Sequence, residues 1–200
     1  MDVLFWDAIQ NRRSIYGLGD EKTVPTERVE EIVRDAIKNT PSAFNSQSTR
    51  ILLLFDDESR KFWRCTLESI RSVTNDAQYA ASEQKINGSF AGGYGTVLFF
   101  EDQTTVEKMQ SSFPFYAGKF PVWSQHTNAM HQIIIWSAFE SEGLGASLQH
   151  YNPIVDEAVH REWLVPENWI LVAQMPFGKP LGVPGAKEFS DVEARIKVFK

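Results

Sequence analysis

Apolar and polar residues follow two different spacings along this chain, and the spacings predict alternating helices and strands. Apolar residues recur every three or four positions in 26–39, which predicts an amphipathic helix that ends before Pro41. The apolar runs 51–55 and 97–100 predict strands over 50–55 and 96–100, and the strand over 50–55 is expected to be buried on both faces. Further helical patterns cover 1–9, 58–74, 81–86 and 154–163, and further extended patterns cover 146–151 and 169–175.

The longest helical pattern lies in the second half of the chain and ends at Gly143-Leu144-Gly145. Its apolar stripe predicts that it is the central helix of the fold. The segment before it, 113–123, combines two prolines and a glycine with five aromatic residues, which predicts an ordered connector without regular structure. The connector aromatics and Tyr94 fit either a wall over a ligand or the core, and the sequence leaves both readings open.

The last part of the chain, about 180–200, is rich in Gly, Pro and Lys but keeps several apolar residues. These are Phe189, Val192, Ile196, Val198 and Phe199. A segment this apolar is not expected to float free in water, so we expect it to pack on its own subunit or on a partner subunit. No linker or internal repeat divides the chain, so residues 1–200 are expected to form one α+β domain with a covered sheet.

Composition and charge narrow the class of protein. With 200 residues and 42% hydrophobic content, the chain can bury one sizeable core. A net charge of −6 argues against nucleic-acid binding, which needs a basic face. Cys65 is the only cysteine, so it excludes an internal disulfide and predicts a buried structural thiol in a reducing cytoplasm.

Membrane insertion and metal binding are not predicted. The N-terminal segment has an early acidic residue and no long apolar stretch, unlike a signal peptide. Apolar runs such as 133–136 are far shorter than the roughly 20 residues that a membrane-spanning helix needs. His126 and His131 would lie about 140° apart around a helix, so they do not share the face that a metal pair requires.

Two polar clusters carry the candidate chemistry. Arg12, Arg13 and Ser14 suit a phosphate dianion, because guanidinium groups donate paired charge-assisted hydrogen bonds and a hydroxyl adds a neutral donor. Asn45 and Gln47 suit the pyrimidine edge of a flavin, because each carboxamide offers both a donor and an acceptor. Taken singly, the arginines are also typical of a solvated helix end, and the two amides are also typical of a turn after proline.

Three motifs together make the chain resemble the nitroreductase family of FMN-dependent oxidoreductases over nearly its whole length. They are Arg12-Arg13-Ser14-Ile15-Tyr16, the segment Pro41-Ser42-Ala43-Phe44-Asn45-Ser46-Gln47, and Gly143-Leu144-Gly145. With Gln149-His150-Tyr151-Asn152-Pro153, they are most similar to a short bacterial and fungal subgroup. Tyr16 departs from the wider family, which has a second arginine or lysine there.

The resemblance implies a nitroreductase-like sandwich, in which helices cover a central, mostly antiparallel sheet and two chains form an intertwined homodimer. It implies a phosphate site with a late basic residue, for which Lys187 matches better than Lys179. It also implies that the loop after Pro41 reaches a flavin bound mainly by the other subunit. The implied FMN-binding residues are Arg12, Arg13, Ser14, Pro41, Ser42, Asn45, Gln47, Lys85, Leu148, Gln149, His150 and Lys187.

The implied activity is hydride transfer from NADH or NADPH to nitroaromatic or quinone acceptors, by a ping-pong mechanism, in oxidative or metal stress defence. The N5 atom of FMN carries the hydride, so no catalytic side chain is expected. Two alternatives remain open at this point. One is a flavin-binding regulatory protein with little turnover, and the other is a flavin-fragmenting or dehalogenating enzyme on the same scaffold.

Overall fold

The computed structural model describes residues 5–200 of the chain, so the first four residues of the helix expected at 1–9 lie outside it. Within the described residues, five strands form one sheet in the order β1-β5-β3-β2, with β4 also paired to β5. Every pairing in this sheet is antiparallel. The strands are β1 (Leu18–Gly19), β2 (Thr49–Phe55), β3 (Gly95–Asp102), β4 (Gly145–Ala146) and β5 (Trp169–Pro180).

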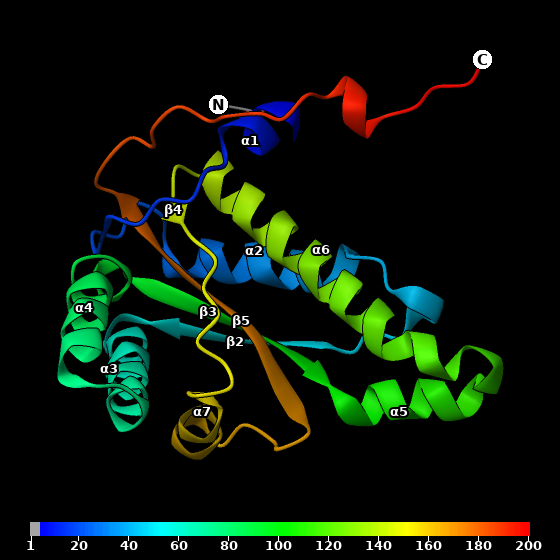
Figure 1. Ribbon diagram of the computed structural model, residues 1–200, viewed down its shortest axis with the longest axis horizontal. Coiled ribbons are helices and arrows are strands. Elements are labelled where there is room, and N and C mark those ends of the chain that lie inside the picture. The colour runs from blue at the N-terminus through cyan, green and yellow to red at the C-terminus, as the bar shows by residue number, and fades with distance from the viewer. Residues whose placement is uncertain (1–4) are drawn as a thin grey trace.

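Helices cover both faces of the sheet, which confirms the predicted α+β sandwich (Figure 1). The α-helices are α1 (Phe5–Asn11), α2 (Thr26–Asn39), α3 (Asp56–Val73), α4 (Asp76–Asn87), α5 (Gln103–Ser112), α6 (Phe120–Ser141) and α7 (Asp156–Trp163). Short 3-10 turns cover Ala43–Asn45, Phe90–Gly92, Pro114–Lys119 and Glu193–Arg195.

Strand β3 runs through the middle of the core and is buried along its whole length. Because side chains alternate across a strand, Val97 and Phe99 join the core beneath α2 and α6. Leu98 and Phe100 point the other way and join the core beneath α3 and α7. The apolar run at 96–100 therefore reflects burial on both faces. Strand β2, expected to be buried on both faces, is instead only partly buried over 50–53, because it lies at the edge of the sheet and pairs with β3 on one side only.

Three local predictions need correction. Helix α5 was not predicted, because 103–112 is mostly polar and carries Val106 as its one buried residue. The segment 113–123 is regular: it forms a 3-10 turn and then the start of α6, where Pro121 is tolerated because the first helical turn leaves its N–H groups unpaired. The strand expected at 146–151 shrinks to β4 and a single bridge from Gln149 to Gln174.

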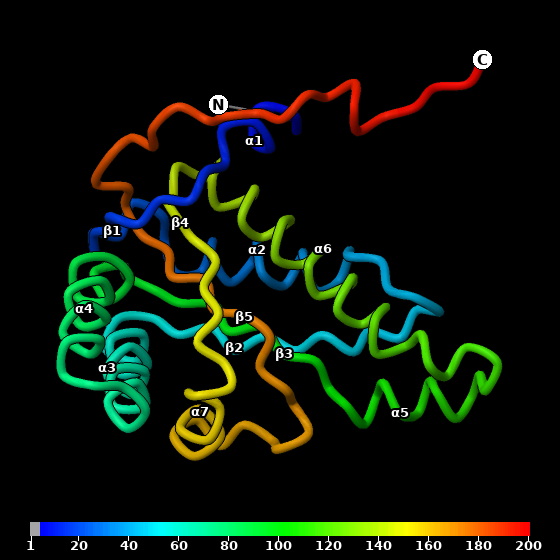
Figure 2. The backbone as a smooth tube through the Cα atoms, viewed as in Figure 1, coloured from blue at the N-terminus to red at the C-terminus, as the bar shows by residue number. Residues whose placement is uncertain are grey.

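The C-terminal tail leaves the sheet after β5 and ends at the edge of the molecule (Figure 2). Its apolar side chains are exposed in the single chain, with Phe189 at 75% and Phe199 at 92% of full exposure. The tail therefore does not bury these side chains on its own subunit. In the part of the chain that the structure describes, no helix is both long and apolar enough to cross a membrane. Cys65 is a buried thiol whose pKa is raised by burial, as predicted.

Candidate functional site

The loop between α2 and β2 has an unusual backbone. Phe44, Asn45 and Gln47 all adopt the left-handed conformation, with φ values of 55°, 54° and 52°. Non-glycine residues in this region cost on the order of 1–3 kcal/mol each and persist only where surrounding contacts hold them. Three such residues within four positions therefore mark a segment whose shape the rest of the protein enforces.

Hydrogen bonds from the loop and the neighbouring strands hold this conformation. The Gln47 backbone N–H donates to Ser42 Oγ at 3.0 Å, and Arg50 donates to the Gln47 carbonyl at 2.8 Å. Arg50 also forms an ion pair with Asp102 at 2.7 Å, while the Asp102 N–H donates to the Ser48 carbonyl at 3.0 Å. The loop is thus fixed to the end of β3.

The side chains of Asn45 and Gln47 remain available for a ligand. Both residues are exposed, and Gln47 makes only a long side-chain contact, from Nε2 to the Asn45 carbonyl at 3.4 Å. Pro41 is exposed and Ser42 is half-buried. The structure therefore presents the two predicted amides together at the surface, on one loop whose backbone is held in place.

An aromatic cluster lies against the same loop. The Phe44 ring stacks on Trp123 at 6.0 Å and an interplanar angle of 22°, and it also contacts Phe113, Tyr116 and Phe120. A cavity of about 360 Å³ opens between Phe44, Trp123 and α6. The connector aromatics thus form a wall beside the loop, whereas Tyr94 is fully buried in the core and donates to the Val24 carbonyl at 3.2 Å.

The arginine motif follows α1 and has few partners. The Arg12 guanidinium lies over the Trp136 ring at 4.3 Å, and its buried Nε has no hydrogen-bond partner within the described residues. Burial and the charge of Arg13 lower the Arg12 pKa, while Glu140 opposes them. A partly buried guanidinium with an orphaned donor fits an anionic ligand.

Backbone pairing brings the arginine motif next to the Gly-Leu-Gly turn. Ser14 forms a parallel bridge with Ala146, and the Ile15 N–H donates to the Ala146 carbonyl at 2.9 Å. Tyr16, at the end of the motif, packs on Phe90 with ring centroids 6.2 Å apart. The Lys85 ammonium lies over the same Phe90 ring at 5.5 Å. Lys85 therefore lies close to Tyr16, the residue that stands where the wider family has an arginine or lysine.

The segment 148–150 is separated from the end of β4 by one residue, and its three side chains differ in how far they are buried. Leu148 is half-buried against the core, and His150 is exposed. Gln149 is buried: its backbone exchanges hydrogen bonds with Gln174, and its side chain donates to Ser147 Oγ at 3.1 Å. The Gln174 side chain also accepts from the Tyr151 N–H at 2.7 Å, which ends regular pairing there.

The two late lysines lie apart from the motif residues just described. The Lys187 ammonium contacts the ring of Phe189 at 5.2 Å, within the exposed tail. Lys179, at the end of β5, forms an ion pair with Glu21. Within residues 5–200 of the single chain, neither lysine forms a hydrogen bond or an ion pair with Arg12, Arg13 or Ser14.

The arginine motif and the amide loop lie at opposite ends of the sheet (Figure 1). Ala146, beside Ser14, pairs with Phe177, which pairs with Gly95 at the start of β3. The loop instead reaches Glu101, six positions further along β3, or about 20 Å at the rise of an extended strand. One chain therefore does not bring both clusters to the same small ligand.

Sequence reasoning missed the residues that hold the loop, above all Glu101. This carboxylate is fully buried and accepts hydrogen bonds from Ser48, Thr49 and Asn128. His131 was considered only as a metal ligand, yet it is buried, its pKa is lowered by burial, and it lines a cavity of about 150 Å³ with Ser42 and Gln47. The paired acids at 101–102 were the available signal, but they directly follow the strand predicted at 96–100, where acidic residues usually face solvent.

Comparison with known proteins gives consistent matches over the chain. A model with the description "Nitroreductase family" matches residues 9–179. The nitroreductase FRM2 of Saccharomyces cerevisiae is 36% identical over 187 residues, which cover 92% of this chain and 92% of the yeast protein.

Solved structures give the same picture. The nitroreductase CinD from Lactococcus lactis, solved in complex with chloramphenicol, matches with a TM-score of 0.90 and 40% identity over 98% of this chain and 100% of that chain. The same protein has also been solved with 4-nitrophenol. A protein from Exiguobacterium sibiricum in complex with FMN shares the fold at a TM-score of 0.73 and 11% identity, over 100% of this chain and 99% of that chain.

Proposed function

Since the chain belongs to the nitroreductase family, we propose that it is an FMN-dependent oxidoreductase that passes hydride from NADH or NADPH to nitroaromatic or quinone acceptors. When bound, FMN would supply the hydride-carrying atom, which explains why the site needs no acid or base of its own. The complexes of CinD with chloramphenicol and 4-nitrophenol support nitroaromatic compounds as the acceptor class.

The observation that carries the FMN proposal is the Arg12 guanidinium, whose buried Nε lacks a partner within residues 5–200. A phosphate dianion would satisfy this donor, and Ser14 would add a hydroxyl from the same motif. We propose that Arg13 lies near the ribityl chain or the pyrimidine edge. Lys85, beside Tyr16 and Phe90, and Lys187 of the tail are the two candidates for the remaining positive charge.

We propose that Leu148, Gln149 and His150 lie beside the flavin ring, because their segment starts where Ser14 pairs with Ala146. Leu148 and His150 offer an apolar and a polar side chain there, while Gln149 would act mainly through its backbone, since its side chain is turned inward to Ser147. An open, apolar ring face would accept a flat nicotinamide and then a flat acceptor in turn. Because both substrates would use the same place on the ring, ping-pong kinetics are expected. We also propose that the enzyme acts in defence against oxidative or metal stress.

The separation of the two polar clusters supports a homodimer. Pro41, Ser42, Asn45 and Gln47 lie about 20 Å along the strands from the level of Ser14, too far for the short ribityl chain that joins the phosphate of FMN to its ring. A second copy of the chain would bring its loop to the flavin held by the first. Each site would then use the arginine motif of one subunit and the amide loop of the other.

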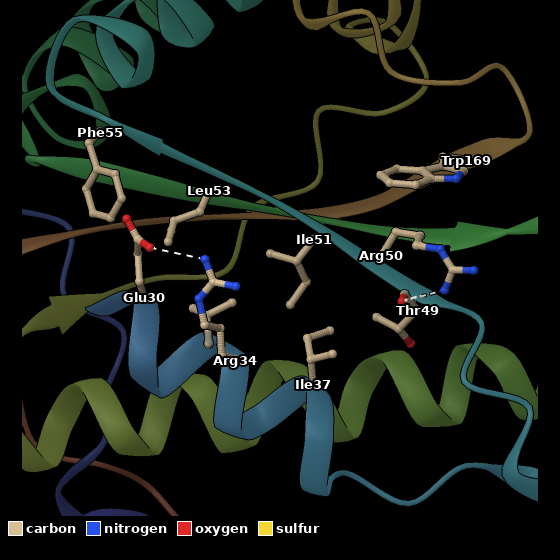
Figure 3. Close-up of a pocket in the computed structure, with 10 residues that line it drawn as sticks. Glu30, Arg34, Ile37, Thr49, Arg50, Ile51, Leu53, Phe55 and Trp169 are labelled. Carbon is tan, nitrogen blue, oxygen red and sulfur yellow. Dashed lines mark hydrogen bonds and ion pairs between the residues drawn. The ribbon is translucent and has the colours of Figure 1, made fainter. Parts of the chain in front are cut away.

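The outer edge of β2 offers a place for the partner's tail. Between β2 and α2 runs a groove of about 590 Å³, where Ile51 and Leu53 face Ile37 (Figure 3). Strand β2 pairs with β3 on one side only in the described sheet, so its other edge can accept a further strand. The exposed tail carries Ile196 and Val198 at alternate positions, as a strand that fills an apolar groove requires.

Flavin content and turnover test the function directly. The purified protein should carry FMN, NADH or NADPH should bleach its visible flavin absorption without oxygen, and 4-nitrophenol or a quinone should restore it. A protein that takes up no FMN would overturn the proposal. A flavin that no nicotinamide reduces would favour a binding protein, and loss of the flavin itself during turnover would favour a flavin-consuming enzyme.

The dimer has a separate test by sedimentation. The wild-type chain should sediment as a dimer, and Ile196→Asp with Val198→Asp should weaken the dimer by placing charges in the groove. Lys197→Asp is the control, since its side chain would point away from the groove. Equal dimer dissociation constants for all three proteins would exclude this role of the tail.

We also propose a cytoplasmic location, which the single, reduced Cys65 supports.

A further inference from the structure

Glu101 is a buried carboxylate to which the proposed chemistry gives no role. It lies near the end of β3 with none of its surface exposed. Ser48 Oγ donates to its Oε2 at 2.5 Å, Thr49 Oγ1 donates to its Oε1 at 2.7 Å, and Asn128 Nδ2 donates to Oε1 at 2.9 Å. The nearest opposite charge, Arg50, is directed to Asp102 instead.

Burial of a carboxyl group lowers the stability of the fold unless hydrogen-bond donors satisfy its oxygen atoms. Burial raises the Glu101 pKa, and the hydrogen bonds from Ser48, Thr49 and Asn128 oppose that shift. An apolar residue here would avoid the burial of a carboxyl group but would leave three donors without acceptors. The carboxyl group is therefore suited to joining these three groups rather than to filling space.

The three donors belong to two different parts of the protein. Ser48 and Thr49 directly follow the left-handed residues of the loop, while Asn128 lies on α6. Asn128 is itself fixed, since Gln132 Nε2 donates to its Oδ1 at 2.7 Å. Through Glu101, the end of the loop is tied to the central helix and to the middle strand of the sheet.

We propose that Glu101 is a positioning residue that holds segment 42–49 in the conformation in which Asn45 and Gln47 meet the edge of the bound FMN. The inference rests on the proposed function. Glu101 does not touch the flavin in this account: it acts through Ser48 and Thr49, whose backbone continues directly from the strained loop.

Two substitutions at Glu101 separate positioning from simple burial. Glu101→Gln keeps the shape and can keep Oε1 as the acceptor for Thr49 and Asn128, while its amide donates to Ser48 Oγ. Glu101→Ala removes all acceptors. Ser59→Ala is a matched control, because it breaks a buried hydroxyl pair with Thr96, 2.8 Å long, at the other end of β3.

The first measurement needs no cofactor. Hydrogen exchange of the peptide that covers 42–49 should be roughly tenfold faster in the FMN-free Glu101→Ala protein than in wild type, because orphaned donors release the loop. Glu101→Gln should exchange close to the wild-type rate. Ser59→Ala should lower the melting temperature without changing exchange in 42–49.

The second measurement reports on FMN. Glu101→Ala should bind FMN roughly tenfold more weakly and shift the visible flavin spectrum, and Glu101→Gln should restore both. Unchanged exchange in 42–49, or faster exchange with wild-type FMN affinity and spectrum, would overturn the inference. If Glu101→Ala does not fold, Ser48→Ala replaces it, with the same directions expected and the same results overturning the inference.

This failure is distinct from failure of the proposed function. If wild type itself binds no FMN, the proposed function is wrong, and the inference falls with it. If wild type binds FMN and the Glu101 variants behave like wild type, only the positioning role is wrong.

Discussion

The amide loop and the arginine motif differ in how much of their shape the protein itself provides. The loop holds three left-handed residues, and Arg50, Glu101 and Asp102 hold it by hydrogen bonds. The arginine motif pairs through its backbone with Ala146, while the Arg12 Nε has no partner in the described residues. Contacts within the chain therefore hold the loop in its conformation, whereas the arginine motif keeps a buried donor that an anion would satisfy.

This difference teaches how the two halves of the site should respond to FMN. The loop should keep its conformation without a ligand, because its constraints are internal. The arginine motif should gain most of its order from the phosphate, because a buried donor without an acceptor is unfavourable. Substitutions in the motif should therefore change affinity strongly, whereas substitutions in the loop should change the environment of the ring.

The largest effect is expected from Arg12→Ala. Loss of a charge-assisted bond to phosphate costs about 1.5–3 kcal/mol, so FMN should bind roughly 10- to 100-fold more weakly. Titration of FMN-free protein, followed by flavin fluorescence, measures the change. Arg161→Ala is the control, because Arg161 is an exposed arginine paired with Glu162 on α7. An FMN affinity equal to that of wild type would remove Arg12 from the site.

A smaller effect is expected from Asn45. Asn45→Ala should weaken FMN binding by about 1 kcal/mol, the typical net value of a neutral hydrogen bond, and should shift the flavin spectrum. Asn45→Gly should do the same while tolerating the φ of 54° without strain. If glycine restores the spectrum and the affinity, the residue serves the backbone and not the ring edge.

The charge near Tyr16 gives a third, weaker effect. Lys85 is exposed, so Lys85→Ala should weaken FMN binding only by about 0.2–1 kcal/mol, with partial recovery in Lys85→Arg. Binding should also become less sensitive to salt in Lys85→Ala. The same titration with Lys187→Ala decides between the two lysines: the base that completes the phosphate site is the one whose removal reduces the salt dependence.

The smallest effect concerns stability and pH. Burial raises the Glu101 pKa above its ordinary value of 4.5, so the folded chain keeps a proton there that the unfolded chain releases. Its contribution to the free energy of unfolding therefore falls as pH rises from 4.5 through the raised pKa. Glu101→Gln lacks this titration. Urea unfolding across roughly pH 4–8 should show Glu101→Gln gaining stability relative to wild type as pH rises, and a constant difference would contradict the shift.

Helix α2 and strand β3 could be predicted because each has a clear apolar pattern. The sequence of α2 buries Val29, Ile32, Val33 and Ala36 on one side, and β3 is apolar throughout its middle. Helix α5 lacks such a stripe, although Asp102 caps it by accepting from the Thr104 N–H at 3.0 Å. That capping signal was present in the sequence but depended on knowing where β3 ends.

The shape of the site could not be predicted from local sequence. The left-handed conformation of Phe44 and Gln47 depends on Glu101 and Asp102, which lie more than fifty residues away in the chain. Tyr151 leaves its expected strand because the Gln174 side chain takes its N–H. Both features arise from contacts between distant segments, which no period of apolar residues records.

The central claim is that each FMN site takes its arginine motif and its amide loop from different subunits. Mixed dimers of Arg12→Ala with Asn45→Ala test it most directly, by FMN affinity after separation of the heterodimer with two affinity tags. The claim predicts one site of wild-type affinity in each heterodimer, built from the unaltered motif of one chain and the unaltered loop of the other. If both sites of the heterodimer bind FMN as weakly as the single variants do, the claim is contradicted.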